Sequence, residues 1–139
     1  MDVLYTATAT ATGGRQGRVR SSDGVLDLGL AMPKELGGGG GAATNPEQLF
    51  AAGYAACFEN ALLRVARERK APIRESSVTA QVGLGREEGG HFRLTVALEV
   101  SVPGRDRAEV EEMVRVAHEE VCPYSRATRG NIEVKAKVV

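Results

Sequence analysis

Two cysteines, Cys57 and Cys122, are the residues of this 139-residue chain with the clearest chemical potential. Cys57 lies inside an apolar segment, and Cys122 directly precedes Pro123. No CxxC motif is present, which excludes a thioredoxin-like motif but not a redox cycle that uses two distant cysteines. Free cysteines are also among the most buried residue types, so two inert core side chains remain the alternative.

A reactive thiol must be ionised at neutral pH, and apolar burial opposes this because it disfavours charge. An active Cys57 therefore needs a cation nearby. Arg15 is the candidate, since the two glycines before it permit a tight turn that directs the guanidinium into a pocket. Arg18 and Arg20 are alternatives, and each of these arginines is otherwise read as a solvated surface charge.

An arginine in an apolar pocket needs an anionic partner, and Glu47 could hold the guanidinium of Arg15 in bidentate fashion. The alternative role of Glu47 is a carboxylate at the positive end of a helix dipole. Glu47 precedes Cys57 by ten residues, which is about 15 Å along a straight helix. Either the helix breaks between them, or Glu47 serves the Cys57 of a second copy. We favour the second case, a site across a two-fold interface.

Metal and serine chemistry are less well supported. His118 and Cys122 are four residues apart on one helix face, and with His91 and Cys57 they would make a Cys2His2 zinc site. The closely paired ligand spacings of zinc motifs are absent, so we predict no metal site, and His118 is otherwise a partly exposed helical residue. Ser125 lacks the GxSxG context of a serine hydrolase.

Helix signals predict the elements that carry these side chains. A helix is expected over residues 46–70, because Asn45 is a good N-cap, Pro46 fits the first helical position and Ala71-Pro72 ends the pattern. A second helix begins at the D-x-x-E capping pattern of Asp106 and closes at Pro123.

Alternating apolar and polar residues predict the strands. They are expected at residues 2–12, within 15–31 around a turn at 21–24, as a hairpin of 76–84 with 92–102, and at 131–138. This order predicts an α+β fold with mostly antiparallel pairing, in a single domain over residues 1–139. The five glycines at 37–41 predict a surface loop rather than a phosphate cradle, because no Lys-Ser/Thr pair follows them.

Composition excludes several classes of protein. Lys and Arg (18) balance Asp and Glu (18), and aromatic residues are 4% with no Trp, so neither a basic surface nor stacking platforms for nucleic acid are expected. No secretory signal is recognised, and the most apolar stretch has eleven residues, well below the roughly 20 that a membrane span needs. We therefore expect a cytoplasmic protein whose cysteines do not form a permanent disulfide.

Seven segments spread over nearly the whole chain follow one family pattern: LYTA (4–7), TGGR (12–15), SSDG (21–24), TNPEQLFAAGY (44–54), ACF (56–58), CPYS (122–125) and TRGNI (128–132). With these segments the chain resembles the organic hydroperoxide resistance (Ohr) branch of the Ohr/OsmC family. Two features depart from the pattern. The glycine loop is richer in glycine than expected, and Glu59 places a charge where a less polar residue is expected.

The resemblance implies a thiol peroxidase that reduces alkyl and fatty-acid hydroperoxides to alcohols. It also implies an intertwined homodimer, with antiparallel sheets wrapped around two core helices and active sites at the subunit interface. By motif position, Cys57 is the peroxidatic cysteine, Cys122 the resolving cysteine, Arg15 the active-site arginine and Glu47 its carboxylate partner. No cofactor is bound, and a lipoylated protein is the expected dithiol reductant.

Three other functions stay open at this point. One is an OsmC-branch peroxidase with a different substrate preference, the second a non-catalytic dimer that binds an apolar ligand, and the third a redox sensor with a protein partner. For the peroxidase, apolar walls would favour an alkyl hydroperoxide over hydrogen peroxide. The residues expected in those walls are Leu49, Phe50, Phe58 and Met113.

Overall fold

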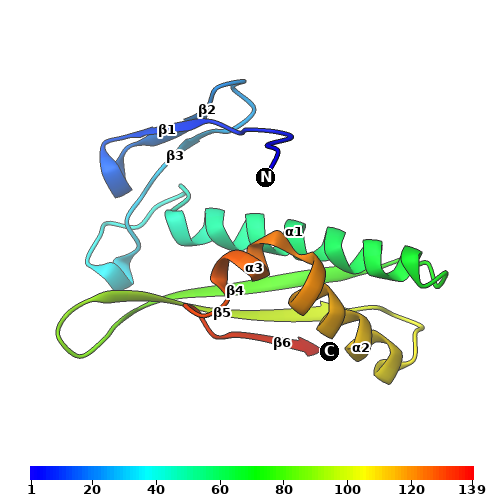
Figure 1. Ribbon diagram of the computed structural model, residues 1–139. Helices are drawn as coiled ribbons and strands as arrows, with labels where there is room; N and C mark the ends of the chain where they lie inside the picture. Colours follow the sequence, from blue (N-terminus) through cyan, green and yellow to red (C-terminus); the bar gives the residue numbers. More distant parts are fainter. The chain divides into compact units, whose positions relative to one another are not determined.

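The computed structural model describes residues 1–139 as two compact units, Met1–Leu49 (unit 1) and Phe50–Val139 (unit 2). Along the chain, three strands precede the long helix α1, and a hairpin, two further helices and a last strand follow it (Figure 1). The predicted α+β class is confirmed. The single domain over residues 1–139 stays a prediction.

Unit 1 contains a three-stranded antiparallel sheet of β1 (Ala9–Thr12), β2 (Arg18–Ser21) and β3 (Asp27–Gly29), in the order β1-β2-β3. The strand predicted over residues 2–12 covers only its last four residues, all of them exposed. Alternating Thr and Ala favour a strand but give it no large apolar face. The strand therefore gains little from burial, which explains why it is short. A 3-10 turn, Gly14–Gln16, links β1 to β2 and carries Arg15.

Helix α1 (Pro46–Glu68) begins where the sequence predicts, because Asn45 Oδ1 accepts the backbone N–H of Gln48 at 2.9 Å. It ends two residues before the expected Lys70, which adopts a positive φ of 55°. The helix is continuous over its 23 residues. None of the helices is long and apolar enough to span a membrane.

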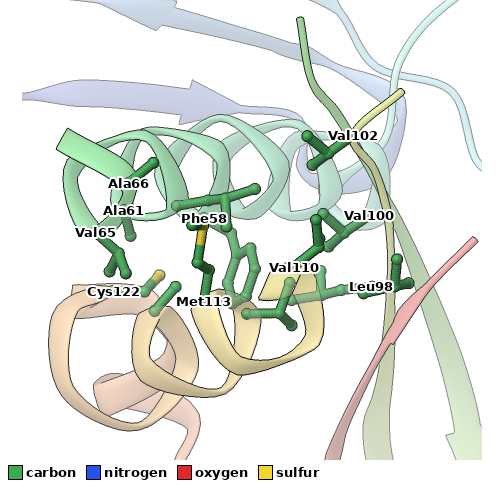
Figure 2. Close-up of a cluster of buried hydrophobic side chains, with 14 of the residues drawn as sticks. Phe58, Ala61, Val65, Ala66, Leu98, Val100, Val102, Val110, Met113 and Cys122 are labelled. Carbon is green, nitrogen blue, oxygen red and sulfur yellow. The ribbon is translucent and has the colours of Figure 1, made fainter. Parts of the chain in front are cut away.

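Unit 2 is built on a sheet of β4 (Ser77–Arg86), β5 (Phe92–Ser101) and β6 (Val134–Val138). The β4–β5 hairpin is antiparallel as predicted, whereas β6 pairs parallel to β5, so the pairing in the chain is mostly antiparallel, as expected, with one parallel exception. Parallel neighbours need a long crossover, and the helical segment between β5 and β6 supplies it. Alternate residues of β5 are buried and join side chains of α1 and α2 in one apolar core (Figure 2).

The crossover begins with α2 (Arg107–Val116), which Asp106 caps as predicted by accepting the backbone N–H of Glu109 at 3.0 Å. The helix then widens into a π-helical segment, Ala117–Val121. This helical run ends at Val121 and Cys122 is extended, so the predicted end just before Pro123 is confirmed, but Pro123 also opens a third helix that the sequence pattern did not predict, α3 (Pro123–Thr128). Proline is well suited to the first position of a helix, where its missing N–H needs no partner.

Candidate active site

The two cysteines, 65 residues apart in sequence, lie side by side in unit 2, with Cys122 Sγ 3.7 Å from Cys57 Sγ. Both are free thiols. Cys57 is on α1 and partly exposed, whereas Cys122 caps α3 and is 2% exposed, as part of the core in Figure 2. A disulfide has an S–S distance of about 2.05 Å. The two sulfurs are therefore in contact but not bonded, and a small movement would bring them within bonding distance.

The surroundings of Cys57 in unit 2 oppose its ionisation. Burial raises the pKa of the Cys57 thiol, and the neighbouring Cys122 raises it further, while a hydrogen bond from the backbone of Tyr124 lowers it in part. The net effect places the pKa above its ordinary value, so these groups keep the thiol protonated at neutral pH. Activation therefore needs a positive charge in addition to them, as the sequence analysis expects.

Arg15 and Glu47 form a bidentate ion pair within unit 1. Arg15 Nη1 and Nη2 each donate to one carboxylate oxygen of Glu47, both at 2.7 Å. The hydrogen bond from Arg15 is the main cause that lowers the pKa of Glu47, and the same bond raises the pKa of Arg15, so both groups are charged. The Arg15 side chain is 31% exposed, which leaves part of the guanidinium accessible. The predicted pairing is thus present.

Arg18, one of the two alternative arginines, is engaged elsewhere. Arg18 Nε donates to Asp27 Oδ1 at 2.6 Å, across the β2–β3 pair, and the Arg18 side chain is 59% exposed. This geometry favours Arg15 over Arg18 as the cation for a thiolate. The catalytic roles of Arg15, Glu47, Cys57 and Cys122 themselves stay predictions.

The continuity of α1 decides between the two arrangements that the sequence left open. Glu47 lies in the first turn of α1 and Cys57 in its middle, with no break between them. Ten residues of unbroken helix separate the two Cα atoms by about 15 Å. The first alternative, a broken helix, is therefore wrong, and a site that uses both residues is compatible with a second copy of the chain.

A buried polar network that the sequence analysis missed lies next to the cysteines. Tyr54 donates its hydroxyl hydrogen bond to Ser125 Oγ at 3.0 Å and is 3.1 Å from Thr128 Oγ1, while His118 Nδ1 lies 2.9 Å from Ser125 Oγ. Tyr54 and Ser125 are fully buried, and Thr128 is 5% exposed. The signal in the sequence that could have indicated this network is the spacing of Ser125 and Thr128, which are three residues apart and so lie on one face of a helix.

Aromatic side chains form a second group that the spacing did not reveal. The rings of Phe50, Tyr54 and Tyr124 pack against one another, with centroids 5.7–6.4 Å apart. Phe50 is partly buried and Tyr124 is 41% exposed, so this group presents apolar surface to solvent. Since the Tyr124 backbone also contacts the Cys57 sulfur, this surface lies beside the partly exposed thiol.

Two of the four expected wall residues have a different role. Phe58 and Met113 are almost completely buried in the unit 2 core, so they pack the core and do not line an open wall. Leu49, the last residue of unit 1, is partly exposed. The unexplained charge at Glu59 has a partner, because Ser76 Oγ donates to Glu59 Oε1 at 2.7 Å and so fixes the entry to β4.

The zinc alternative finds no support in the geometry. The structure brings together no group of three or more His, Cys, Asp or Glu side chains that could hold a metal ion. His118 instead contacts Ser125, and burial, together with the charge of Arg129, lowers the pKa of His118. The imidazole is therefore neutral at pH 7.

Comparison with known proteins gives consistent matches. The model of the OsmC-like protein family matches residues 38–137. An organic hydroperoxide resistance protein of Xanthomonas axonopodis pv. citri is 58% identical over 133 residues, covering 95% of this chain and 92% of the relative. The crystal structure of an organic hydroperoxide resistance protein from Legionella pneumophila superposes with a TM-score of 0.93 at 53% identity, covering 99% of this chain and 98% of the other. That of OhrB from Bacillus subtilis gives 0.90 at 48% identity, covering 99% and 100%.

Proposed function

This chain belongs to the organic hydroperoxide resistance branch of the OsmC-like family, and we propose that it detoxifies organic hydroperoxides by reducing them to alcohols with the thiols of Cys57 and Cys122. The observation that carries the proposal is the distance of 3.7 Å between two free thiols in unit 2. A pair so close is suited to open and close a disulfide in a redox cycle.

In the first step, the Cys57 thiolate attacks the distal oxygen of the hydroperoxide. The O–O bond breaks, the sulfur becomes a sulfenic acid and the alkoxide leaves as the alcohol after taking up a proton. The partial exposure of Cys57, against the 2% of Cys122, supports Cys57 as the attacking thiol. Arg15 would lower the pKa of this thiol and stabilise the negative charge that develops on the peroxide oxygens.

In the second step, Cys122 attacks the sulfenic sulfur of Cys57. The S–S bond forms, the S–O bond breaks and the hydroxyl leaves as water with the thiol proton. An external dithiol must then supply two electrons and two protons to restore the thiols. We extend the proposal to a lipoyl-bearing protein as this reductant, with no bound cofactor in the chain itself.

The active site would be shared between two copies of the chain. Unit 1 has one buried apolar residue, Leu30, but many exposed ones. The large apolar side chains that it exposes are Met1, Val3, Leu4, Tyr5, Val25, Leu26, Leu28 and Leu36. A homodimer would cover such a surface, and in it Glu47 and its Arg15 would serve the Cys57 of the partner, an arrangement that the unbroken α1 supports.

The substrate preference follows from the surface beside Cys57. The exposed part of this cluster, formed by Phe50 and Tyr124 over the fully buried Tyr54, is apolar and would contact the organic group of an alkyl hydroperoxide. Hydrogen peroxide has no group to occupy this surface. We therefore expect a higher second-order rate constant for cumene hydroperoxide than for hydrogen peroxide.

The redox cycle is tested by intact-mass measurement of the reduced protein after addition of cumene hydroperoxide. The wild type should lose two hydrogens as the disulfide forms, whereas Cys122→Ser should accumulate sulfenic or sulfinic acid. Serine is the matched control because it keeps the size of the side chain. Cysteines that stay unmodified at micromolar peroxide would leave a non-catalytic apolar-ligand-binding protein as the better account.

The shared site is tested by mixing two inactive variants, Arg15→Ala and Cys57→Ser, under conditions that exchange subunits. If Arg15 acts on the partner's Cys57, each mixed dimer has one intact site, and the mixture recovers about a quarter of the wild-type activity. If both residues act within one chain, no site is intact and the mixture stays inactive. The oligomeric state of each variant, measured by sedimentation, is the control.

A further inference from the structure

We propose that the buried hydrogen-bond network of Tyr54, Ser125, Thr128 and His118 positions Cys122 for disulfide formation. The network would set the rate at which the Cys57 sulfenic acid is resolved, without affecting the attack on peroxide. This inference rests on the function proposed above. It assigns a role to the CPYS and TRGNI segments beyond the cysteine itself.

The network joins the two helices that carry the cysteines. Tyr54 is three residues before Cys57 on α1, so both side chains emerge on the same side of the helix. Ser125 and Thr128 lie on α3, where their hydroxyls contact the Tyr54 hydroxyl at 3.0 and 3.1 Å. The position of α3 relative to the Cys57 turn of α1 is therefore fixed by directional contacts.

Cys122 is attached to α3 through its own side chain and backbone. The Ser125 N–H points at Cys122 Sγ at 3.5 Å, and the Arg126 N–H donates to the Cys122 carbonyl at 3.0 Å. Any shift of the first turn of α3 thus moves the sulfur with it. Because the contact between the sulfurs is already 3.7 Å, a shift of about 1 Å is large compared with the remaining approach to a bond.

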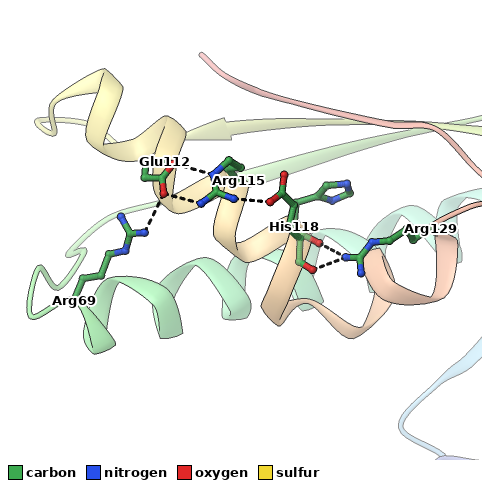
Figure 3. Close-up of polar contacts among 6 residues, drawn as sticks. Arg69, Glu112, Arg115, His118 and Arg129 are labelled. Atoms are coloured by element: carbon green, nitrogen blue, oxygen red, sulfur yellow. Dashed lines mark hydrogen bonds and ion pairs between the residues drawn. The ribbon is translucent and has the colours of Figure 1, made fainter.

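The π-helical segment before Cys122 is held by the same region of the chain. His118 is neutral, so the Ser125 hydroxyl can donate to its Nδ1 while accepting from Tyr54. Arg129 Nη2 donates to the backbone carbonyls of His118 at 2.9 Å and Glu119 at 2.7 Å (Figure 3). Both segments that flank Cys122 are therefore anchored.

A polar network inside an apolar core needs a reason, because apolar side chains of similar shape would satisfy burial alone. No buried side-chain nitrogen or oxygen lacks a hydrogen-bond partner. A complete network of this kind costs little and fixes one arrangement, whereas apolar contacts permit sliding. Disulfide chemistry between two helices needs such a fixed arrangement.

The chemical consequence is a competition for the sulfenic acid. In resolution, Cys122 displaces the hydroxyl of Cys57–SOH as water and the disulfide forms. In the competing reaction, a second hydroperoxide transfers an oxygen to Cys57–SOH, which yields the sulfinic acid and one alcohol. A displaced Cys122 slows the first reaction only, so the sulfinic fraction rises with peroxide concentration.

The test compares Tyr54→Phe and Thr128→Val, which remove hydroxyls with little change of shape, with Thr128→Ser, which keeps the hydroxyl. Reduced protein is mixed with one equivalent of cumene hydroperoxide, and sulfenic acid and disulfide are followed by quenched-flow mass spectrometry. In Tyr54→Phe and Thr128→Val, disulfide formation should slow by roughly tenfold or more, while sulfenic acid forms at the wild-type rate. With ten equivalents of peroxide, these two variants should also accumulate sulfinic acid.

Thr128→Ser should close its disulfide at a rate close to that of the wild type. The proposal is overturned if Tyr54→Phe and Thr128→Val close at the wild-type rate, if Thr128→Ser slows equally, or if both steps slow together, as a general loss of packing would cause. Oxidation by diamide, which needs no peroxide, separates this result from a failure of the proposed function. The same two variants should form the disulfide more slowly there even if the wild type does not react with peroxide.

Discussion

The two units hold their candidate site residues by different means. Sixteen buried apolar residues of unit 2, Cys122 among them, form one core against which Cys57 packs, while Leu30 is the single buried apolar residue of unit 1, which carries Arg15 and Glu47. Two sulfurs form a bond only within a narrow range of geometry, so their supports must be rigid. An ion pair tolerates more freedom because its attraction acts over several ångströms and its bidentate geometry aligns the groups.

Under the proposed homodimer, the difference indicates which part of the chain would depend on assembly. Unit 2 has its own apolar core, which includes Cys122 and packs against Cys57. Unit 1 has a short sheet, exposed apolar side chains and an accurately paired arginine, which fits a segment that completes its packing against another copy. The following predictions test this contrast between a thiol pair held in an apolar core and an ion pair that the proposed dimer would support.

The largest effect is expected at Cys57. Cys57→Ser should abolish consumption of cumene hydroperoxide, because no nucleophile remains, whereas Cys122→Ser should still complete one turnover. A stopped-flow measurement with excess protein separates the two. A Cys57→Ser variant that retains a first turnover would show that Cys122 is able to attack peroxide.

Arg15→Ala should come next, with a loss of roughly 10²- to 10³-fold in the second-order rate constant for peroxide. The reason is the burial of Cys57, which raises its pKa and leaves the thiol protonated without the cation. The pH at which iodoacetamide alkylates Cys57 at half its maximal rate should rise. Arg18→Ala is the matched control, and an unchanged pH profile in Arg15→Ala would remove this arginine from the mechanism.

Truncation of a core side chain in unit 2 should lower the free energy of unfolding more than truncation of an apolar side chain in unit 1. Leu62 is fully buried in that core, and Leu62→Ala should lower the free energy of unfolding by about 2–5 kcal/mol. The exposed Leu28 of unit 1 is the control. At low protein concentration, urea denaturation should give the same free energy of unfolding of unit 2 for Leu28→Ala as for the wild type. An equal loss of unfolding free energy in Leu62→Ala and Leu28→Ala would contradict the contrast between the two units.

Acid should weaken the ion pair before it affects the core. The hydrogen bond from Arg15 holds the pKa of Glu47 below its ordinary value of 4.5. The pair therefore stabilises the folded chain above the unfolded pKa, and this contribution is lost as the pH falls through the folded pKa. In thermal melts, Glu47→Gln should remove the part of the fall in melting temperature below about pH 5 that is due to this pair. An identical acid profile in Glu47→Gln would indicate that other carboxylates dominate.

The smallest effect is expected on the outer face of α2, where Arg115 contacts Glu112 and Glu119 (Figure 3). Arg115 and Arg69 lower the pKa of Glu112 to about 2. All these groups are exposed, so solvent screens the interaction and Arg115→Ala should shift the melting temperature little. High salt should reduce even this shift, and a large change in melting temperature would point to a packing role for the arginine side chain.

Local signals predicted a good part of the architecture. Asn45 and Asp106 cap their helices as expected, and the β4–β5 hairpin forms where alternating residues indicate it. The bidentate pairing of Arg15 with Glu47 was also predictable, because a guanidinium with limited exposure needs a partner. Each of these inferences depends on a few neighbouring residues or on the charge that one side chain requires.

The sequence by itself therefore determined the helix starts, the strand pattern, the reactive residue types and, by family resemblance, their expected roles. The tertiary structure alone decided the parallel pairing of β6, the helix that begins at Pro123, and the networks that join Cys57 to Cys122 and Tyr54 to Ser125. These last pairs are 65 and 71 residues apart in sequence. Capping and periodicity act over one or two turns of chain, whereas contacts at that separation form only when the helices pack against a common core.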